Sequence, residues 1–234
     1  MAATTVGYGG EAAATDTLSE RAAGFLERDI VAGRLKPGSR LAITELAQHY
    51  DIGATPLREG LSRLVSRGLI VAIGQRGFRV ASVSREDLAD ITRMRVVVEV
   101  EALRLAMQNG GDAWEANILS ALHQLRRHIE RVGVKFREGA EDFDALHKGF
   151  HTSLLQACGS MRLLAAHSDL YDQAYRYRRV MMRGFDSGER FAEVHQELAE
   201  RVIARDAVKA RAMLAEHLET TLHFVYPVQK GDKL

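Results

Sequence analysis

The chain has few of the features that mark secreted, fibrous or membrane-embedded proteins. It contains one cysteine, three prolines and 6% aromatic residues among 234 residues. The single cysteine, Cys158, excludes an intrachain disulfide framework and indicates a reducing compartment, so we expect a cytoplasmic protein. No apolar run approaches the roughly 20 residues that span a bilayer, so no membrane partner is expected. Residues 1–16 are rich in Gly and Ala, lack a signal-peptide core and are predicted to be disordered.

An excess of charge of one sign is also missing, because the formal net charge is +1. Residues 1–83 carry ten Lys and Arg against eight Asp and Glu, a net of +2, and residues 84–234 carry 22 against 23, a net of −1. Five arginines nevertheless fall between residues 58 and 80, with Glu59 as the one acid. Phosphates are bound by local basic patches, so this cluster points to nucleic acid although the whole-chain charge does not.

The abundant residues favour helices arranged as two small domains. Apolar residues make up 46% of the chain, and Ala, Leu, Arg and Glu are frequent, so we predict a mainly α fold with a sizeable core. Residues 17–83 form a first domain with a small β-hairpin, and residues 84–228 form an all-α helical bundle without strands. The helices predicted in the bundle are 85–108, 113–132, 140–157, 160–183, 188–204 and 206–226.

The first domain has the element order of a winged helix-turn-helix. Thr17-Leu-Ser-Glu20 is a capping box that opens the first helix. Thr44 is predicted to cap a short second helix. Thr55-Pro56 is predicted to start the recognition helix, with the proline at its favoured first position. Two short strands then flank the loop Gly74-Gln75-Arg76-Gly77, which therefore forms a wing.

The recognition helix and the wing carry residue types that contact DNA. Leu57, Leu61 and Leu64 recur at helical spacing and face a core, which leaves Arg58 and Arg63 outside the apolar stripe. An arginine in the wing can enter a minor groove. The alternatives are that Thr55 only caps its helix and that the arginines are only solvated. The residues predicted to contact DNA are Thr44, Thr55, Pro56, Arg58, Arg63, Gln75, Arg76 and Gly77.

These motifs resemble a known family. TPLREGLSRLVSRGLI and GQRGFRV are similar to the DNA-binding domain of GntR-type bacterial transcription regulators. FHTSLLQACGSMRLL and EVHQELAERVIARDAVKARAMLAEHL resemble the helical effector domain, called FCD, of the FadR branch. HKGFHTSLLQACGS and LYDQAYRYR resemble regulators related to the carbon-starvation-induced repressor. The resemblance implies a homodimer on a near-palindromic double-stranded DNA operator, commonly a repressor, that responds to a small carboxylate effector.

Four of the nine histidines stand beside apolar stripes of predicted helices. His147 and His151 are four residues apart and share one helix face, and His195 and His217 adjoin leucines on two further helices. Helix bundles build metal sites from such inward-facing side chains, and imidazole suits zinc, nickel, copper or iron. The alternative is that each is a core histidine with a hydrogen bond.

The resemblance implies a divalent metal at these four positions, with zinc or nickel expected first. Relatives often carry Asp where this chain has His147, so the four imidazoles leave the charge of the metal uncompensated. Such a site favours an anionic ligand in an open coordination position. Asp144 is a substitute ligand or a group behind the ligands.

Residues for effector binding are predicted by the resemblance and by residue type. Arg95 can hold a carboxylate through a bidentate pair, or it can form a salt bridge to a glutamate. Tyr171, Tyr175 and Arg178 lie in a polar-aromatic run and are predicted to line the effector pocket. The alternative is that most of this run only packs in the core or lies on the surface. A metal-dependent enzyme is the alternative function, and a DNA-binding architectural protein is a third. No poised general base, nucleophile motif or phosphate loop supports an enzyme.

Overall fold

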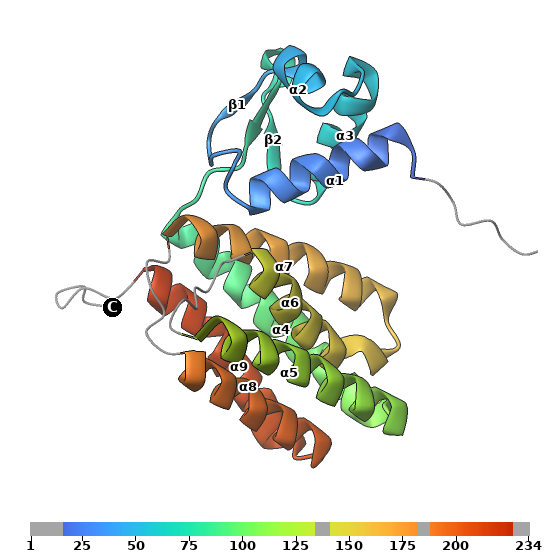
Figure 1. Cartoon of the computed structure of the whole chain (residues 1–234), viewed down its shortest axis with the longest axis vertical. Coiled ribbons are helices and arrows are strands. Elements are labelled where there is room, and N and C mark those ends of the chain that lie inside the picture. The colour runs from blue at the N-terminus through green and yellow to red at the C-terminus, as the bar shows by residue number, and fades with distance from the viewer. Residues whose placement is uncertain (1–15, 134–140, 182–187, 227–234) are drawn as a thin grey trace, which may run out of the picture.

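The computed structural model describes residues 16–133, 141–181 and 188–226. A small N-terminal domain lies against one side of a larger helical domain (Figure 1). The predicted mainly α fold is confirmed, with a small sheet confined to the N-terminal domain. The predicted disorder of residues 1–16 falls outside the described residues except for Asp16, and so does the end of the second predicted domain at residue 228. No helix in the described ranges is long and apolar enough to cross a bilayer.

The N-terminal domain is a winged helix-turn-helix with a three-stranded antiparallel sheet in the order β1-β3-β2. Its core is aliphatic, and Leu26, Leu57 and Leu61 are fully buried between α1 and α3. The wing prediction is confirmed, but β1 was not predicted, because a two-residue strand is defined only by its pairing with β3. The elements are α1 (Leu18–Val31), β1 (Arg40–Leu41), α2 (Ile43–Tyr50), α3 (Ala54–Ser66), β2 (Ile70–Ala72), η1 (Gly74–Arg76) and β3 (Phe78–Val80).

Two predicted helix caps of this domain are wrong. The Thr17 capping box is present, with the Thr17 side chain accepting from the Glu20 amide. However, α2 begins one residue before Thr44 and α3 begins at Ala54, each without a side-chain cap. Thr44 and Thr55 are therefore the second residues of their helices, and Pro56 is the third residue of α3. The reason is that the backbone is extended at Ala42 and at Gly53, so these residues take the capping position and each helix starts directly after them.

The helical domain packs its elements around one large apolar core. Leu103, Ile118, Phe150 and Leu214 are completely buried there. Predicted and observed helix ends agree within about two residues, as expected for boundaries, except that residues 156–158 form a 3-10 turn. The elements are α4 (Arg85–Asn109), α5 (Asp112–Val132), α6 (Glu141–Leu155), η3 (Gln156–Cys158), α7 (Met161–Met181), α8 (Gly188–Ile203) and α9 (Ala207–Val225).

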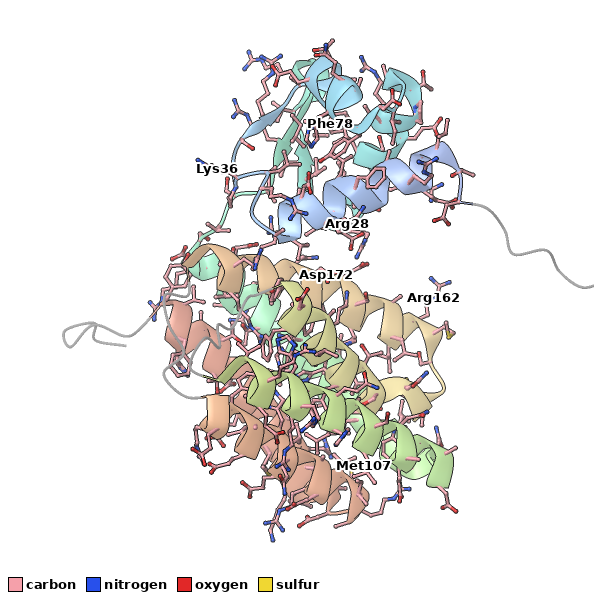
Figure 2. All side chains as sticks on the ribbon, in the orientation of Figure 1. Arg28, Lys36, Phe78, Met107, Arg162 and Asp172 are labelled. Atoms are coloured by element: carbon pink, nitrogen blue, oxygen red, sulfur yellow. The ribbon has the colours of Figure 1, made fainter. Side chains whose placement is uncertain are left out.

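Helix α7 connects the two domains. Arg67, which follows α3, pairs with Glu27 of α1 at 2.5 Å and with Asp169 and Asp172 of α7 at 2.6 and 2.8 Å. Asp172 also accepts from Lys148 of α6 at 2.6 Å. Figure 2 shows Asp172 on the side of the helical domain that faces α1. Arg67 belongs to the basic cluster of residues 58–80, for which solvation was the alternative to DNA contact. It does neither of these alone, because its guanidinium pairs with three carboxylates at the domain boundary.

Candidate functional site

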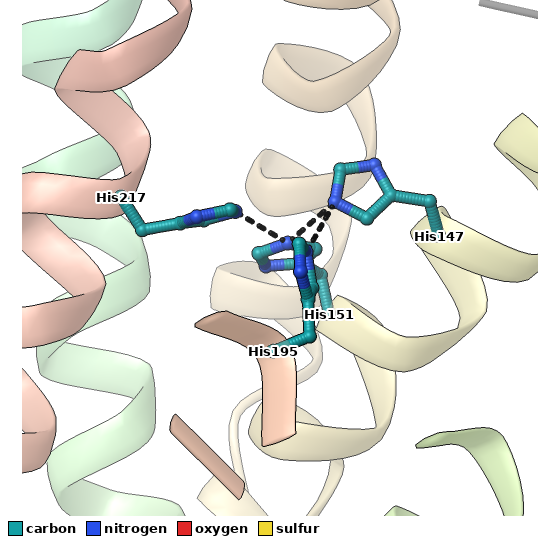
Figure 3. A group of neighbouring side chains, drawn as sticks. All are labelled: His147, His151, His195 and His217. Atoms are coloured by element: carbon teal, nitrogen blue, oxygen red, sulfur yellow. Dashed lines mark hydrogen bonds between the residues drawn. The ribbon is translucent and has the colours of Figure 1, made fainter. Parts of the chain in front are cut away.

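The four predicted histidines converge inside the helical domain (Figure 3). Helix α6 supplies His147 and His151, which its i, i+4 spacing places on one face. Helix α8 supplies His195 and α9 supplies His217. His147 Nε2 lies 3.0 Å from both His151 Nε2 and His195 Nε2, and His217 Nε2 lies 3.2 Å from His151 Nε2. All four candidate ligand atoms fall within 4.8 Å of one another.

Burial keeps these rings in the form that binds metal. His147, His151 and His195 are at most 1% exposed, and His217 is half-buried at the edge. Desolvation, helped by the neighbouring rings and Arg178, holds the pKa of His147 well below its ordinary value. Burial acts in the same direction on the pKa of His151 and of His217, and it lowers the pKa of His195 to about 4. The rings are therefore neutral near pH 7 and have lone pairs to offer.

Hydrogen bonding at His195 directs its lone pair at the cluster. Its Nδ1 lies 2.7 Å from the Phe191 carbonyl oxygen, which only accepts, so Nδ1 carries the hydrogen. His195 Nε2 then has no hydrogen and faces His147 Nε2. Nitrogens bound to one zinc at about 2.0–2.1 Å stand roughly 3.3 Å apart in a tetrahedral site. The three Nε2···Nε2 distances given above, 3.0, 3.0 and 3.2 Å, are close to that separation. Four neutral imidazoles are therefore a donor set that fits a divalent cation.

A chain of polar groups stands behind His147. Tyr171 Oη lies 3.0 Å from His147 Nδ1 and donates to Asp144 Oδ1 at 2.9 Å. Arg178 Nη1 lies 3.0 Å from the same Nδ1, and its Nη2 donates to Thr221 at 2.9 Å. Burial raises the pKa of Asp144 to about 7. Asp144 is outside the group of four and reaches it only through Tyr171, which fits the expectation of a group behind the ligands.

A cavity of about 370 Å³ opens beside the histidines. His195 and His217 line it together with Arg178, Thr220 and Thr221. Of the predicted effector residues, Arg178 lines this cavity and Tyr171 contacts the histidine cluster behind it. Arg190, Glu197 and Glu216 also line it, so charges of both signs surround the cavity. Arg178 and the two threonine hydroxyls, next to the candidate metal site, are the groups that could bind a small anion.

The other two predicted effector residues lie elsewhere. Arg95 is 1% exposed and donates to Glu99 Oε1 at 2.7 Å, so the salt bridge considered from the sequence is present. Burial opposes the charge on Glu99, but Arg95 and His167 hold its pKa below the usual value. Tyr175 stacks on Tyr171 and lines a separate cavity of about 800 Å³ at the domain boundary.

The predicted DNA-contacting side chains lie on the exterior of the N-terminal domain. Arg58, Arg63 and Arg76 are exposed, as are Thr44 and Thr55. Pro56 and Gly77 are half-buried, and the side chain of Gln75 lies outside the described residues. Arg63 is also 3.5 Å from Glu20, so part of its charge is neutralised within the domain.

Two exposed arginines of the wing were not among the predicted contacts. Arg40 of β1 and Arg79 of β3 stand opposite each other in the sheet register. Arg79 donates to the Gly38 carbonyl at 2.9 Å, which steadies its guanidinium. Only the pairing of β1 with β3 brings Arg40 to the wing, so sequence spacing gave no signal for it.

Comparisons with known proteins agree with this architecture. The family described as "Bacterial regulatory proteins, gntR family" matches residues 18–80, and the family described as "FCD domain" matches residues 90–220. The HTH-type transcriptional repressor GlaR of Escherichia coli is 34% identical over 212 residues, which cover 89% of this chain and 96% of GlaR. The HTH-type transcriptional regulator BphR of Paraburkholderia xenovorans is 36% identical over 200 residues, with 86% and 82% covered.

Solved structures share the fold over almost the whole chain. E. coli McbR/YncC superimposes with a TM-score of 0.74 at 23% identity, covering 91% of this chain and 98% of McbR. A GntR regulator from Rhodococcus superimposes with a TM-score of 0.69 at 22% identity, covering 91% and 99%. At these identities the likeness supports the fold alone.

Proposed function

The chain belongs to the GntR family of bacterial regulatory proteins and carries an FCD domain, and from this premise we propose a ligand-responsive repressor. Its relatives are transcription regulators, so the chain is a regulator and not an enzyme. The proposed repressor binds an operator and leaves it when a small organic acid binds near a metal. The observation that supports this mechanism is a cavity lined by Arg178, His195 and His217, directly beside the cluster of four neutral imidazoles.

The DNA-binding part of the proposal is supported by the exposed arginines of α3 and of the wing. Arg58 near the start of α3 is proposed to contact a base or phosphate, and Arg76 to reach a minor groove. Arg40 and Arg79 add phosphate contacts beside the wing. Paired recognition helices read two half-sites, so we propose a homodimer on a near-palindromic operator. A regulator of DNA acts in the cytoplasm, and we propose that location.

The metal part is supported by the donor set and by tautomer control. His147, His151, His195 and His217 would hold a divalent cation, with zinc or nickel preferred by imidazole. The bound cation would supply positive charge at the cavity, where an effector carboxylate binds. Arg178 would pair with that carboxylate through its guanidinium, and the Tyr171 ring would support both groups from behind. Arg95 and Tyr175 would act indirectly, through their contacts with Tyr171.

Two measurements on the untagged full-length protein test this proposal. Elemental analysis and zinc titration of the metal-free chain should give about one metal per chain, and His151→Ala should lose it. A thermal-shift screen of organic acids with zinc present should find an acid that stabilises the fold by mass action. That acid should release the protein from the promoter of its own gene cluster in an anisotropy assay. Retention of full metal in a His151→Ala/His195→Ala variant would leave these residues as core histidines.

A further inference from the structure

His147 differs from the other three histidines because two neighbours require opposite protonation of its Nδ1. Above the Asp144 pKa of about 7 the side chain is a carboxylate that only accepts, so Tyr171 donates its one hydroxyl proton to it at 2.9 Å. The Tyr171 oxygen therefore accepts from His147 Nδ1, 3.0 Å away, which must carry a hydrogen. Arg178 Nη1 is also 3.0 Å from Nδ1, and a guanidinium only donates, so this contact requires a lone pair there.

The two requirements correspond to two tautomers of a neutral ring. With the hydrogen on Nδ1, His147 Nε2 has a lone pair directed at His151 and His195, each 3.0 Å away. With the hydrogen on Nε2, the same atom has no lone pair and cannot bind a cation. The contact with Tyr171 therefore favours the metal-binding ring. The contact with Arg178 opposes it, and so does the lone pair of His195 Nε2, which accepts from His147 Nε2 in the other tautomer.

We propose that Tyr171 and Asp144 position His147 as a metal ligand and that Arg178 holds the metal-free ring in the tautomer that cannot bind. This inference rests on the proposed metal centre. Metal binding moves the single ring proton from Nε2 to Nδ1, where it is donated to Tyr171, and the ring gains no charge. Arg178 then faces an N–H group and turns away from His147.

Burial makes this competition strong. His147 is fully buried, and Tyr171 and Arg178 are 1% and 4% exposed. Two donors forced together without water lose a hydrogen bond and repel each other, which is costly in a low dielectric. The displaced guanidinium is still anchored to Thr221 and lines the cavity beside His217. Metal binding thus prepares Arg178 to pair with an anionic ligand.

Zinc affinity of the untagged full-length chain tests the inference when it is measured against a chelating dye at about pH 8, above the Asp144 pKa of about 7. Tyr171→Phe removes the hydroxyl and keeps the ring, and we expect affinity to fall by roughly 10–100-fold, as for other groups behind metal ligands. Arg178→Met removes the competing donor, and we expect tighter zinc binding. Tyr50→Phe is the matched control and should bind as wild type, because the Tyr50 hydroxyl donates to Asp29 in the N-terminal domain, away from the four histidines.

Nitrogen-15 NMR of the metal-free protein reads the tautomer directly. We expect His147 to carry its hydrogen on Nε2 in the wild type and a larger share of it on Nδ1 in Arg178→Met, where the His195 lone pair still favours Nε2–H. Asp144→Asn keeps an acceptor for Tyr171 but removes the charge, and it should also weaken zinc binding. It is the substitute test if Tyr171→Phe does not fold. Wild-type zinc affinity in Tyr171→Phe or Asp144→Asn, or weaker zinc binding in Arg178→Met, overturns this inference and leaves the proposed metal centre standing. A wild-type chain that binds no zinc overturns the proposed metal centre as well.

Discussion

His195 shows how one backbone contact turns a core histidine into a candidate ligand. The carbonyl of Phe191, one helical turn earlier, takes the hydrogen of Nδ1 and leaves the Nε2 lone pair facing His147. The sequence identified all four histidines from an i, i+4 pair and from their apolar neighbours. It could not identify the tautomers, because these depend on Phe191, Tyr171 and Arg178, which the fold brings in from α7 and α8.

The pKa shifts correct one expectation about acid. The sequence alone predicts that metal affinity falls as pH drops through about 6.5, the ordinary histidine pKa. In the structure, burial lowers the pKa of His195 to about 4 and depresses that of the other three rings. Protons therefore compete with metal only at lower pH, and we expect zinc affinity to change little between pH 7 and 6. Zinc titrations across that range measure this, and a steep loss near pH 6.5 would contradict the depressed values.

The same shifts predict an acid-labile metal-free chain. The unfolded histidines take up protons below about pH 6.5, whereas folded His195 does so only near pH 4. The unfolded state binds more protons in this interval, so stability rises with pH and is lost as pH falls from 6.5 toward 4. Urea midpoints of the metal-free protein should decline in that window. Midpoints of His195→Phe should decline less, because one such group is gone.

Arg58 is the residue on which the DNA contact of α3 is proposed to depend. It is exposed and lies beside the stripe of buried leucines on α3. Arg58→Ala should weaken operator binding by roughly 1–3 kcal/mol if the guanidinium reads a base. Fluorescence anisotropy at fixed salt measures the loss, and Arg127→Ala, an exposed arginine of the helical domain, is the control. Equal operator affinity in both variants would remove Arg58 from the readout.

At the scale of elements, sequence patterns located the helices better than their starts. Periodicity and the Thr17 capping box predicted their elements correctly, because those signals are local. Thr44 and Thr55 resembled caps, but the helix-turn-helix geometry starts both helices earlier. Strand β1 escaped prediction for the related reason that only its partner β3 defines it.

Gly60 provides a test of how closely α3 packs on α1. A Cβ at this position would lie 2.9 Å from the Ala23 amide nitrogen and 3.1 Å from the Ala22 Cβ. Gly60→Ala should therefore push the helices apart and cost about 1–3 kcal/mol by overpacking. Gly24→Ala on α1 is the matched control, because nothing lies within 4 Å of its added Cβ. It should stabilise by up to about 1 kcal/mol from helix propensity, and equal urea midpoints for the two variants would contradict the close contact.

At the scale of the whole molecule, the candidate metal site and the domain boundary share neighbouring residues. On α6, His147 faces the metal site and Lys148 binds Asp172. On α7, Tyr171 contacts His147 and Asp172 binds Arg67. The sequence suggested both domains but not this connection, because Arg67 looked like one more arginine of a DNA-binding patch. Two of its partners, Asp169 and Asp172, lie more than 100 positions away in α7, and the third, Glu27, lies in α1.

Arg67 should therefore transmit the state of the helical domain to the DNA-binding domain. Arg67→Met removes the shared cation and leaves Glu27, Asp169 and Asp172 without it, so we expect looser docking of the domains. Zinc and the acid found by thermal shift should still bind, because no histidine is changed. In the wild type, we expect that acid to lower operator affinity by about 5–150-fold, the usual range for coupled sites. In Arg67→Met, the acid should leave operator affinity almost unchanged. Anisotropy with and without the acid measures this coupling, and Arg93→Met, an exposed arginine paired within α4, is the control. Wild-type coupling in Arg67→Met would show that the signal passes through other contacts, such as the bond from Arg176 to the Ala81 carbonyl.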